Sequence, residues 1–224
     1  MTPPNDLSPA EIRVLGCLLE EQRTTPDAYP LSLNALRAAC NQSTNRDPVV
    51  DYDEATVRDA LTRLGRRRWT RLTSSAGSRA AKFRHLLDEA LPLSNADRAV
   101  LTVLMLRGPQ TPGELKQRTD RLHNFADLGA INAALESLIA HELAVRLPRR
   151  PGQKEERYAH LLGGEVREGD GGAAMPAVAA PAADAPPPVA PPPPADDRLG
   201  RLEREVAALR EELEELRARL PAQL

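Results

Sequence analysis

The chain has 224 residues, of which 28% are charged, and its formal net charge is −2. No apolar run approaches the roughly 18 residues that a membrane-spanning helix needs, so the sequence excludes a membrane span. The net charge averages over unlike parts, because residues 1–91 carry +1, residues 92–164 carry +2 and residues 165–224 carry −5. The low overall charge therefore does not exclude nucleic-acid binding by the front of the chain.

Two features of the sequence indicate a reducing compartment. The N-terminus lacks the basic segment and the apolar core of a secretory signal. Cys17 and Cys40 fit no metal-binding or redox spacing, and each lies among apolar residues of a predicted helix. We therefore expect two small core side chains, no metal or other cofactor, and a cytoplasmic protein.

The first part of the chain predicts three helices followed by a β-hairpin. We expect the helices near 8–22, 31–40 and 53–67, from the spacing of their apolar residues. Strand candidates at 69–73 and 81–85 are joined by a turn rich in Ser, Ala and Gly. Three helices and a hairpin in this order indicate a winged helix-turn-helix domain.

The second part of the chain repeats the first. Ser94 and Asp97 correspond to Ser8 and Glu11, and each pair predicts a capping box with Ser at the N-cap and an acid at N3. The equivalent elements are helices near 94–107, 111–120 and 127–141 and strand candidates at 143–147 and 157–161. Matches in the same order along both parts indicate two copies of one structural unit.

The predicted fold is mainly α with small β-hairpins (α+β), built from two tandem winged helix-turn-helix domains. Its parts are winged-helix domain 1 at 1–91, winged-helix domain 2 at 92–164, a disordered linker at 165–197 and a coiled-coil helix at 198–224. Of the 33 linker residues, 22 are Ala, Pro or Gly, a composition that cannot build a core.

The predicted third helix of domain 1 has an apolar and a basic face. Val57, Leu61 and Leu64 fall within one sector and should face the core. Residues 56–87 contain nine basic residues and one acidic residue. The predicted DNA contacts are Arg58, Thr62, Arg63, Arg66 and Arg67, with Arg79, Lys82 and Arg84 on the hairpin. Arginines on such a helix can reach guanine or phosphate in the major groove. The alternatives are a solvated face and a docking surface for an acidic protein.

The loop at 41–50 joins the second and third helices of domain 1. Turn chemistry explains most of it, because Asn and Asp bond locally and Pro48 disfavours a helical Asp47. A purely structural loop is one interpretation. In the alternative, Asn45 and Arg46 contact the DNA backbone ahead of the third helix.

Domain 2 is the weaker DNA candidate. The outward face of its predicted third helix is formed by Asn132, Ala133, Glu136, Ser137 and Ala140. This face has no basic residue, and Glu136 would repel phosphate. Its hairpin is basic, so Arg149, Arg150 and Lys154 are predicted to contact a DNA backbone.

The C-terminal segment carries a leucine heptad. Position a is filled by Leu199, Val206, Leu213 and Leu220, and position d by Leu202, Leu209 and Leu216. In a parallel dimer all three g-to-e pairs, Arg198–Glu203, Glu205–Arg210 and Glu212–Arg217, are attractive. We expect a homodimer through these residues. The alternative is a single amphipathic helix that docks on the rest of the chain or on another protein.

Several segments resemble the YceH-like family of uncharacterised bacterial proteins, which pair two winged-helix domains. The similar segments are Asn-Arg-Asp-Pro-Val at 45–49 and the stretches at 118–127, 147–155 and 158–162. The resemblance covers about 8–164 and implies a fold. It brings no established activity and no catalytic residue.

These features together favour a non-enzymatic DNA-binding regulator. We expect double-stranded DNA and a second copy of the chain as partners, with no membrane and no small-molecule substrate. The competing hypothesis is a protein-interaction module whose winged helices and coiled coil dock partner proteins. Steep salt dependence of duplex binding favours the first hypothesis.

Overall fold

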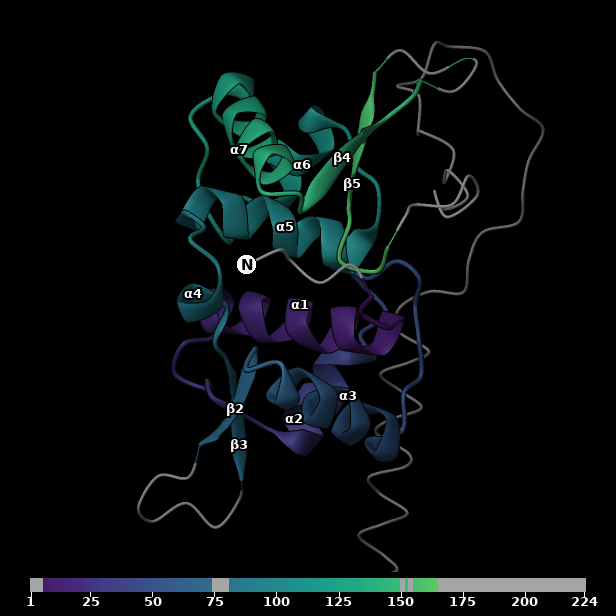
Figure 1. Cartoon of the computed structure of the whole chain (residues 1–224), viewed down its shortest axis with the longest axis vertical. Helices are drawn as coiled ribbons and strands as arrows, with labels where there is room; N and C mark the ends of the chain where they lie inside the picture. Colours follow the sequence, from purple (N-terminus) through teal and green to yellow (C-terminus); the bar gives the residue numbers. More distant parts are fainter. Residues whose placement is uncertain (1–5, 74–80, 150–151, 153–154, 165–224) are drawn as a thin grey trace, which may run out of the picture. The chain divides into compact units, whose positions relative to one another are not determined.

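A computed structural model describes residues 6–73, 81–149, 152 and 155–164. This part of the chain combines helices with two small antiparallel sheets (Figure 1). Its seven helices are α1 (Pro9–Thr24), α2 (Leu33–Cys40), α3 (Glu54–Arg66), α4 (Leu87–Ala90), α5 (Asn95–Arg107), α6 (Pro112–Arg118) and α7 (Leu128–Ala140). No helix within the described ranges has both the length and the apolarity needed to cross a membrane.

The five described strands are short. They are β1 (Leu31–Ser32), β2 (Thr70–Thr73), β3 (Lys82–His85), β4 (Ala144–Leu147) and β5 (Arg157–His160). The first sheet has the order β1-β3-β2, and the second pairs β4 with β5. All pairings are antiparallel, with Arg71 opposite Arg84 in the first sheet and Val145 opposite Ala159 in the second.

The sequence predicted this mixture of helices and small antiparallel hairpins. Each helix and strand predicted between residues 8 and 161 is present, with ends that differ by at most two residues. The predicted linker at 165–197 and the predicted coiled-coil helix at 198–224 lie outside the described residues. Two elements were not predicted, namely β1 and α4. β1 forms because Leu31 is buried opposite Phe83 of β3. A strand of two residues has no sequence pattern of its own, so this long-range pairing could not be predicted from the sequence. α4 begins without a side-chain cap, so no local pattern marks it.

The two predicted capping boxes are confirmed. The backbone N–H of Glu11 donates to Ser8 Oγ at 3.3 Å, and the N–H of Ser8 donates to the Glu11 carboxylate at 3.0 Å. The equivalent distances at Ser94 and Asp97 are 3.1 and 3.0 Å. Each box satisfies backbone donors that the first turn of a helix leaves free.

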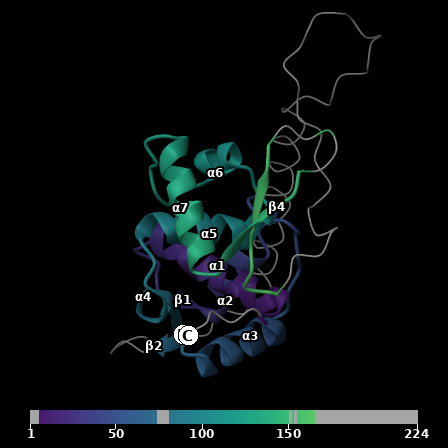
Figure 2. The same cartoon turned by 45° about the horizontal axis from the view of Figure 1, so that its top comes forward.

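Helices α1 and α5 pack against each other between the two sets of remaining elements (Figures 1 and 2). Both are buried on nearly every side of their middle turns, including Leu15 and Leu18 of α1 and Leu101 and Leu104 of α5. Gly16 permits the close approach, because a Cβ atom there would lie 2.8 Å from Leu106 Cδ2. The two predicted core cysteines are also free and buried.

Backbone hydrogen bonds join segments that are far apart in the sequence. The N–H of Leu7 donates to the carbonyl of Leu162 at 2.9 Å. The N–H of Asp47 donates to the carbonyl of Leu106, also at 2.9 Å. These bonds place the start of α1 and the loop before α3 beside the end of α5 and the segment after β5.

Candidate nucleic-acid interface

Helix α3 has the two faces that its sequence predicted. Val57, Leu61 and Leu64 are buried, and Asp53 caps the helix by accepting from the N–H of Thr56 at 2.8 Å. The residues on the opposite face are exposed, and they include Arg58, Thr62, Arg63 and Arg66. A row of arginines is therefore presented to solvent along the whole helix.

Two arginines of this row form ion pairs within the helix. Arg58 pairs with Glu54, and Arg63 lies 3.6 Å from Asp59. Both pairs are well exposed on each side, so each contributes only about 0.3–0.5 kcal/mol. Such pairs leave the guanidinium groups free to exchange a carboxylate for a phosphate.

The hairpin adds basic residues directly after α3. Arg71 of β2 lies opposite Arg84 of β3, so their side chains share one face of the sheet. Arg84 pairs with Glu89 at 2.8 Å, whereas Arg71 has no carboxylate partner within the described ranges. Lys82 begins β3 and is half-buried. Like charges on directly opposed residues are unfavourable, so an anion on this face would relieve repulsion.

Arg68 occupies the tight turn between α3 and β2. Its φ is +61°, and the N–H of the following Trp69 bonds back to Leu64 at 2.9 Å. Helices commonly end with a residue in this left-handed conformation, for which glycine is the preferred type. Arg68 is exposed, and within the described ranges it and Arg66 have no carboxylate partner. The backbone conformation therefore favours glycine at this position, but the residue present is the positively charged Arg68.

Arg67 is bound to the segment before α1. Its guanidinium donates to the Asp6 carboxylate at 2.7 Å and is partly buried. This hydrogen bond lowers the pKa of Asp6. Arg67 therefore contacts the segment before α1 and, unlike Arg66 and Arg68 in the described part of the chain, already has a carboxylate partner.

Arg46, predicted from the sequence as a DNA contact, is instead buried. Its side chain has 0% exposure and donates to the Glu20 carboxylate at 2.5 Å and to the Ala39 carbonyl at 3.2 Å. A third donor reaches the carbonyl of Asn45. Because these donors are already satisfied in the interior, Arg46 organises the loop and does not belong to the exposed basic surface.

Among the described residues, the second half of the chain (residues 92–164) has fewer basic side chains without a carboxylate partner than the first half (residues 6–91). Arg146 of β4 pairs with Glu136 of α7 at 2.8 Å and lies 3.7 Å from Glu156. Arg157 donates to the Glu114 carboxylate at 3.0 Å. Arg149 is exposed. The remaining predicted contacts and the dimer positions lie outside the described residues, namely Arg79, Arg150 and Lys154, and Leu199, Leu202, Val206, Leu209, Leu213, Leu216 and Leu220.

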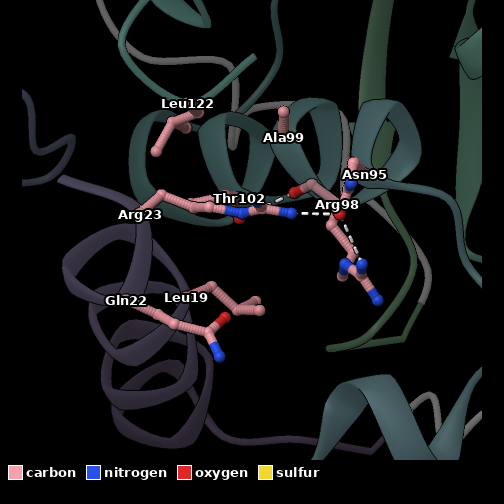
Figure 3. Close-up of a pocket in the computed structure, with 8 residues that line it drawn as sticks. All are labelled: Leu19, Gln22, Arg23, Asn95, Arg98, Ala99, Thr102 and Leu122. Atoms are coloured by element: carbon pink, nitrogen blue, oxygen red, sulfur yellow. Dashed lines mark hydrogen bonds between the residues drawn. The ribbon is translucent and has the colours of Figure 1, made fainter. Parts of the chain in front are cut away.

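A small hollow lies between α1 and α5. Figure 3 shows Asn95 between two guanidinium groups, and its side-chain oxygen accepts from both Arg23 and Arg98. The volume is about 10 Å³, room for about one water molecule. This hollow is a polar link between the two helices and is too small for a ligand.

The fold and the basic surface define a helical protein whose third helix and following hairpin present arginine to solvent. Residues 7–153 match the family model described as "Protein of unknown function, DUF480". The chain belongs to this family, which confirms the resemblance to an uncharacterised bacterial family.

Several proteins named UPF0502 protein are similar to this chain over most of its length. The one from Pelobacter propionicus is 48% identical over 213 residues, covering 94% of this chain and 93% of its own. The one from Azoarcus sp. is 48% identical over 215 residues, covering 95% and 90%. The one from Vibrio atlanticus is 43% identical over 220 residues, covering 95% of both chains.

Proposed function

We propose that this chain is a non-enzymatic, DNA-binding regulatory protein built from two winged-helix halves. In this proposal α3 enters the major groove of duplex DNA, and the β2–β3 hairpin lies along the phosphate backbone. The observation that carries the proposal is the row of exposed arginines on α3 that continues through Arg68 into the Arg71–Arg84 pair.

The order of elements supports this proposal. Each half has three helices followed by a two-stranded hairpin, α1 to α3 with β2 and β3, and α5 to α7 with β4 and β5. Phosphate contacts supply most of the affinity of such domains, and exposed arginine is suited to both phosphate and guanine. The first half is the proposed DNA reader, because α7 exposes Glu136 and has no basic residue, whereas α3 exposes three arginines.

The experiment uses a variant that removes charge without disturbing the fold. Arg68→Gly places the preferred residue type at a φ of +61°, so the domain should remain at least as stable. We expect weaker binding to a fluorescently labelled random duplex and a salt slope reduced by about 1. Arg71→Ala should behave likewise. Fluorescence anisotropy of the full chain across a salt series measures both quantities.

The second half supplies a matched control. Glu142 has a φ of +58° in the equivalent turn, where the N–H of Leu143 bonds back to Leu138 at 2.9 Å. Glu142→Gly should therefore preserve the fold and should not weaken DNA binding. The proposal fails if the full chain binds no duplex at about 50 mM salt, or if Arg68→Gly and Arg71→Ala bind as tightly as the unchanged chain.

We also propose that two copies pair through the C-terminal heptad. The support is the unbroken a/d pattern of seven apolar positions with three attractive g-to-e pairs. A dimer would hold the DNA-reading first halves of two copies together, so we expect it to prefer two half-sites on one duplex. Analytical sedimentation of the full chain and of a 1–164 truncation measures the oligomeric state of each. If both proteins are monomeric, the proposed pairing is wrong.

A further inference from the structure

A cavity of about 360 Å³ lies where the start of α1 meets the end of α5 and β5. Its volume falls within the range of ordinary small-molecule sites. Most of its wall is apolar, with Leu7, Ile12, Met105 and Ala159 among the lining residues. Polar side chains also line it, namely Arg13, Asp47, Tyr52 and His160.

Arg13 is a buried cation whose charge no carboxylate neutralises within the described ranges. The residue is 4% exposed, and its terminal nitrogens donate to the carbonyls of Cys40 at 3.0 Å and Pro48 at 2.6 Å. Its third nitrogen, Nε, is buried and has no hydrogen-bond partner within the described ranges. Burial lowers the pKa of Arg13, and the nearby Arg46 lowers it further. A buried charge in this state is costly unless an anion joins it.

The acidic residue at the cavity does not relieve this charge. Asp47 lines the cavity but is exposed, and its backbone N–H is bonded to Leu106. Arg13 takes two backbone carbonyls instead of the Asp47 carboxylate. The cavity wall therefore includes a buried guanidinium that forms no ion pair with a carboxylate of the described residues.

His160 adds a neutral polar atom. Its Nδ1 is buried without a described partner, and burial lowers the pKa of the imidazole to about 4. At neutral pH the ring is uncharged, so Arg13 is the single cation of the cavity wall. The uncharged ring therefore cannot balance a second negative charge in the cavity.

We propose that this cavity binds a small monocarboxylate with an apolar body, whose carboxylate pairs with the guanidinium of Arg13. The charge of the ligand matches the single cation, and its body would cover the apolar wall. A phosphate or dicarboxylate fits less well, because a second negative charge would find no cation. The site is independent of the proposed DNA surface. Because elements of both halves line it, occupancy should hold the α1–α5 arrangement and raise the unfolding temperature.

The experiment titrates the full chain with phenylacetate and hexanoate, and with phenylacetamide and hexanamide as neutral controls of similar shape. Isothermal titration and the shift in unfolding temperature report binding. We expect at least one carboxylate to bind about tenfold more tightly than its amide, because only the carboxylate brings a charge to Arg13. Absence of binding by both carboxylates, or equal affinity of acids and amides, overturns the proposal.

Variants locate the binding. Arg13→Met removes the cation and should weaken carboxylate binding by at least about tenfold. Because this change also removes two hydrogen bonds, Ala159→Leu offers a second route that fills the apolar end and leaves Arg13 in place. The control is Arg121→Met, in a separate hollow of about 170 Å³ that Arg107 and Arg118 also line. If a folded Ala159→Leu variant still binds the carboxylate, the ligand does not occupy this cavity. Loss of binding in Arg121→Met alone would place the ligand in the other hollow and would also refute the proposal.

Discussion

The guanidinium of Arg46 donates to the carboxylate of Glu20 at 2.5 Å, and the arginine side chain is fully buried. This contact ties the loop before α3 to α1. The loop also reaches α5 through the backbone bond from Asp47 to Leu106. Arg46 thus lies at a junction on which the position of α3 depends.

We expect Arg46→Met to lower the free energy of unfolding by about 3 kcal/mol, because it leaves the Glu20 carboxylate without its partner. Urea unfolding at neutral pH measures the change. Arg63→Met removes a partner of the exposed Asp59 and should cost less than about 1 kcal/mol. Equal effects of the two changes would contradict a structural role specific to Arg46.

Two helical glycines should respond oppositely to larger side chains. Gly16 lies against α5, where an added Cβ would be 2.8 Å from Leu106 Cδ2, so Gly16→Leu should lower stability by about 1–3 kcal/mol. Gly65 of α3 is exposed, and the nearest atom to its added Cβ is Thr70 Oγ1 at 3.9 Å. Gly65→Ala should raise stability by up to about 1 kcal/mol. Thermal unfolding of both variants checks the signs, and a stabilised Gly16→Leu would refute the close packing of α1 on α5.

The two capping boxes should contribute similarly to stability. Ser8→Ala and Ser94→Ala each remove the acceptor that satisfies the N3 backbone donor, and each should cost about 1 kcal/mol. Ser43→Ala, in the exposed loop before α3, should change stability by less than about 0.5 kcal/mol. Chemical unfolding curves give all three values. If Ser8→Ala and Ser94→Ala lower the free energy of unfolding no more than Ser43→Ala does, the capping hydrogen bonds do not stabilise the helices.

Stability should fall as the pH drops from about 6.5 towards 4. Burial lowers the pKa of His85 to about 4, and its ring bonds to Gln22 at 2.7 Å and accepts from the N–H of Leu87 at 3.2 Å. The unfolded chain therefore binds protons in this window that the folded chain excludes, so acid favours unfolding. The loss for this one imidazole should be on the order of 1–2 kcal/mol at pH 5.

Urea unfolding at pH 7 and pH 5 measures this dependence. His85→Gln should be less stable at pH 7 but should lose less stability between the two pH values. The exposed His141 supplies the control, since His141→Gln should keep the full dependence. If the pH dependence of stability is unchanged in His85→Gln, a group other than His85 causes it.

Local patterns were sufficient to predict most elements and the two faces of α3. Ser8 and Ser94 mark helix starts because a cap acts within one turn, and the spacing of Val57, Leu61 and Leu64 assigns the buried face. Such signals depend only on neighbours in the sequence. The exposed Arg58, Thr62, Arg63 and Arg66 follow from the same periodicity.

The environments of individual charges could not be predicted in this way. Arg13 and Arg46 look like other arginines in the sequence, yet both are buried. Both donate to the end of α2, Arg13 to the carbonyl of Cys40 and Arg46 to that of Ala39. One signal was available, since Arg13 stands between Ile12 and Val14 in a helix that is otherwise apolar there. A charged residue in such a run indicates an interior partner or a site.

The sequence by itself determined most of the elements, their repeated order and the basic outer face of α3, because each depends on periodicity and capping over a few residues. Only the tertiary structure decided which basic residues outside α3 are buried. It placed Arg46 on Glu20 in the interior and joined Arg13 and His160 in one cavity, because burial depends on packing between segments distant in the sequence.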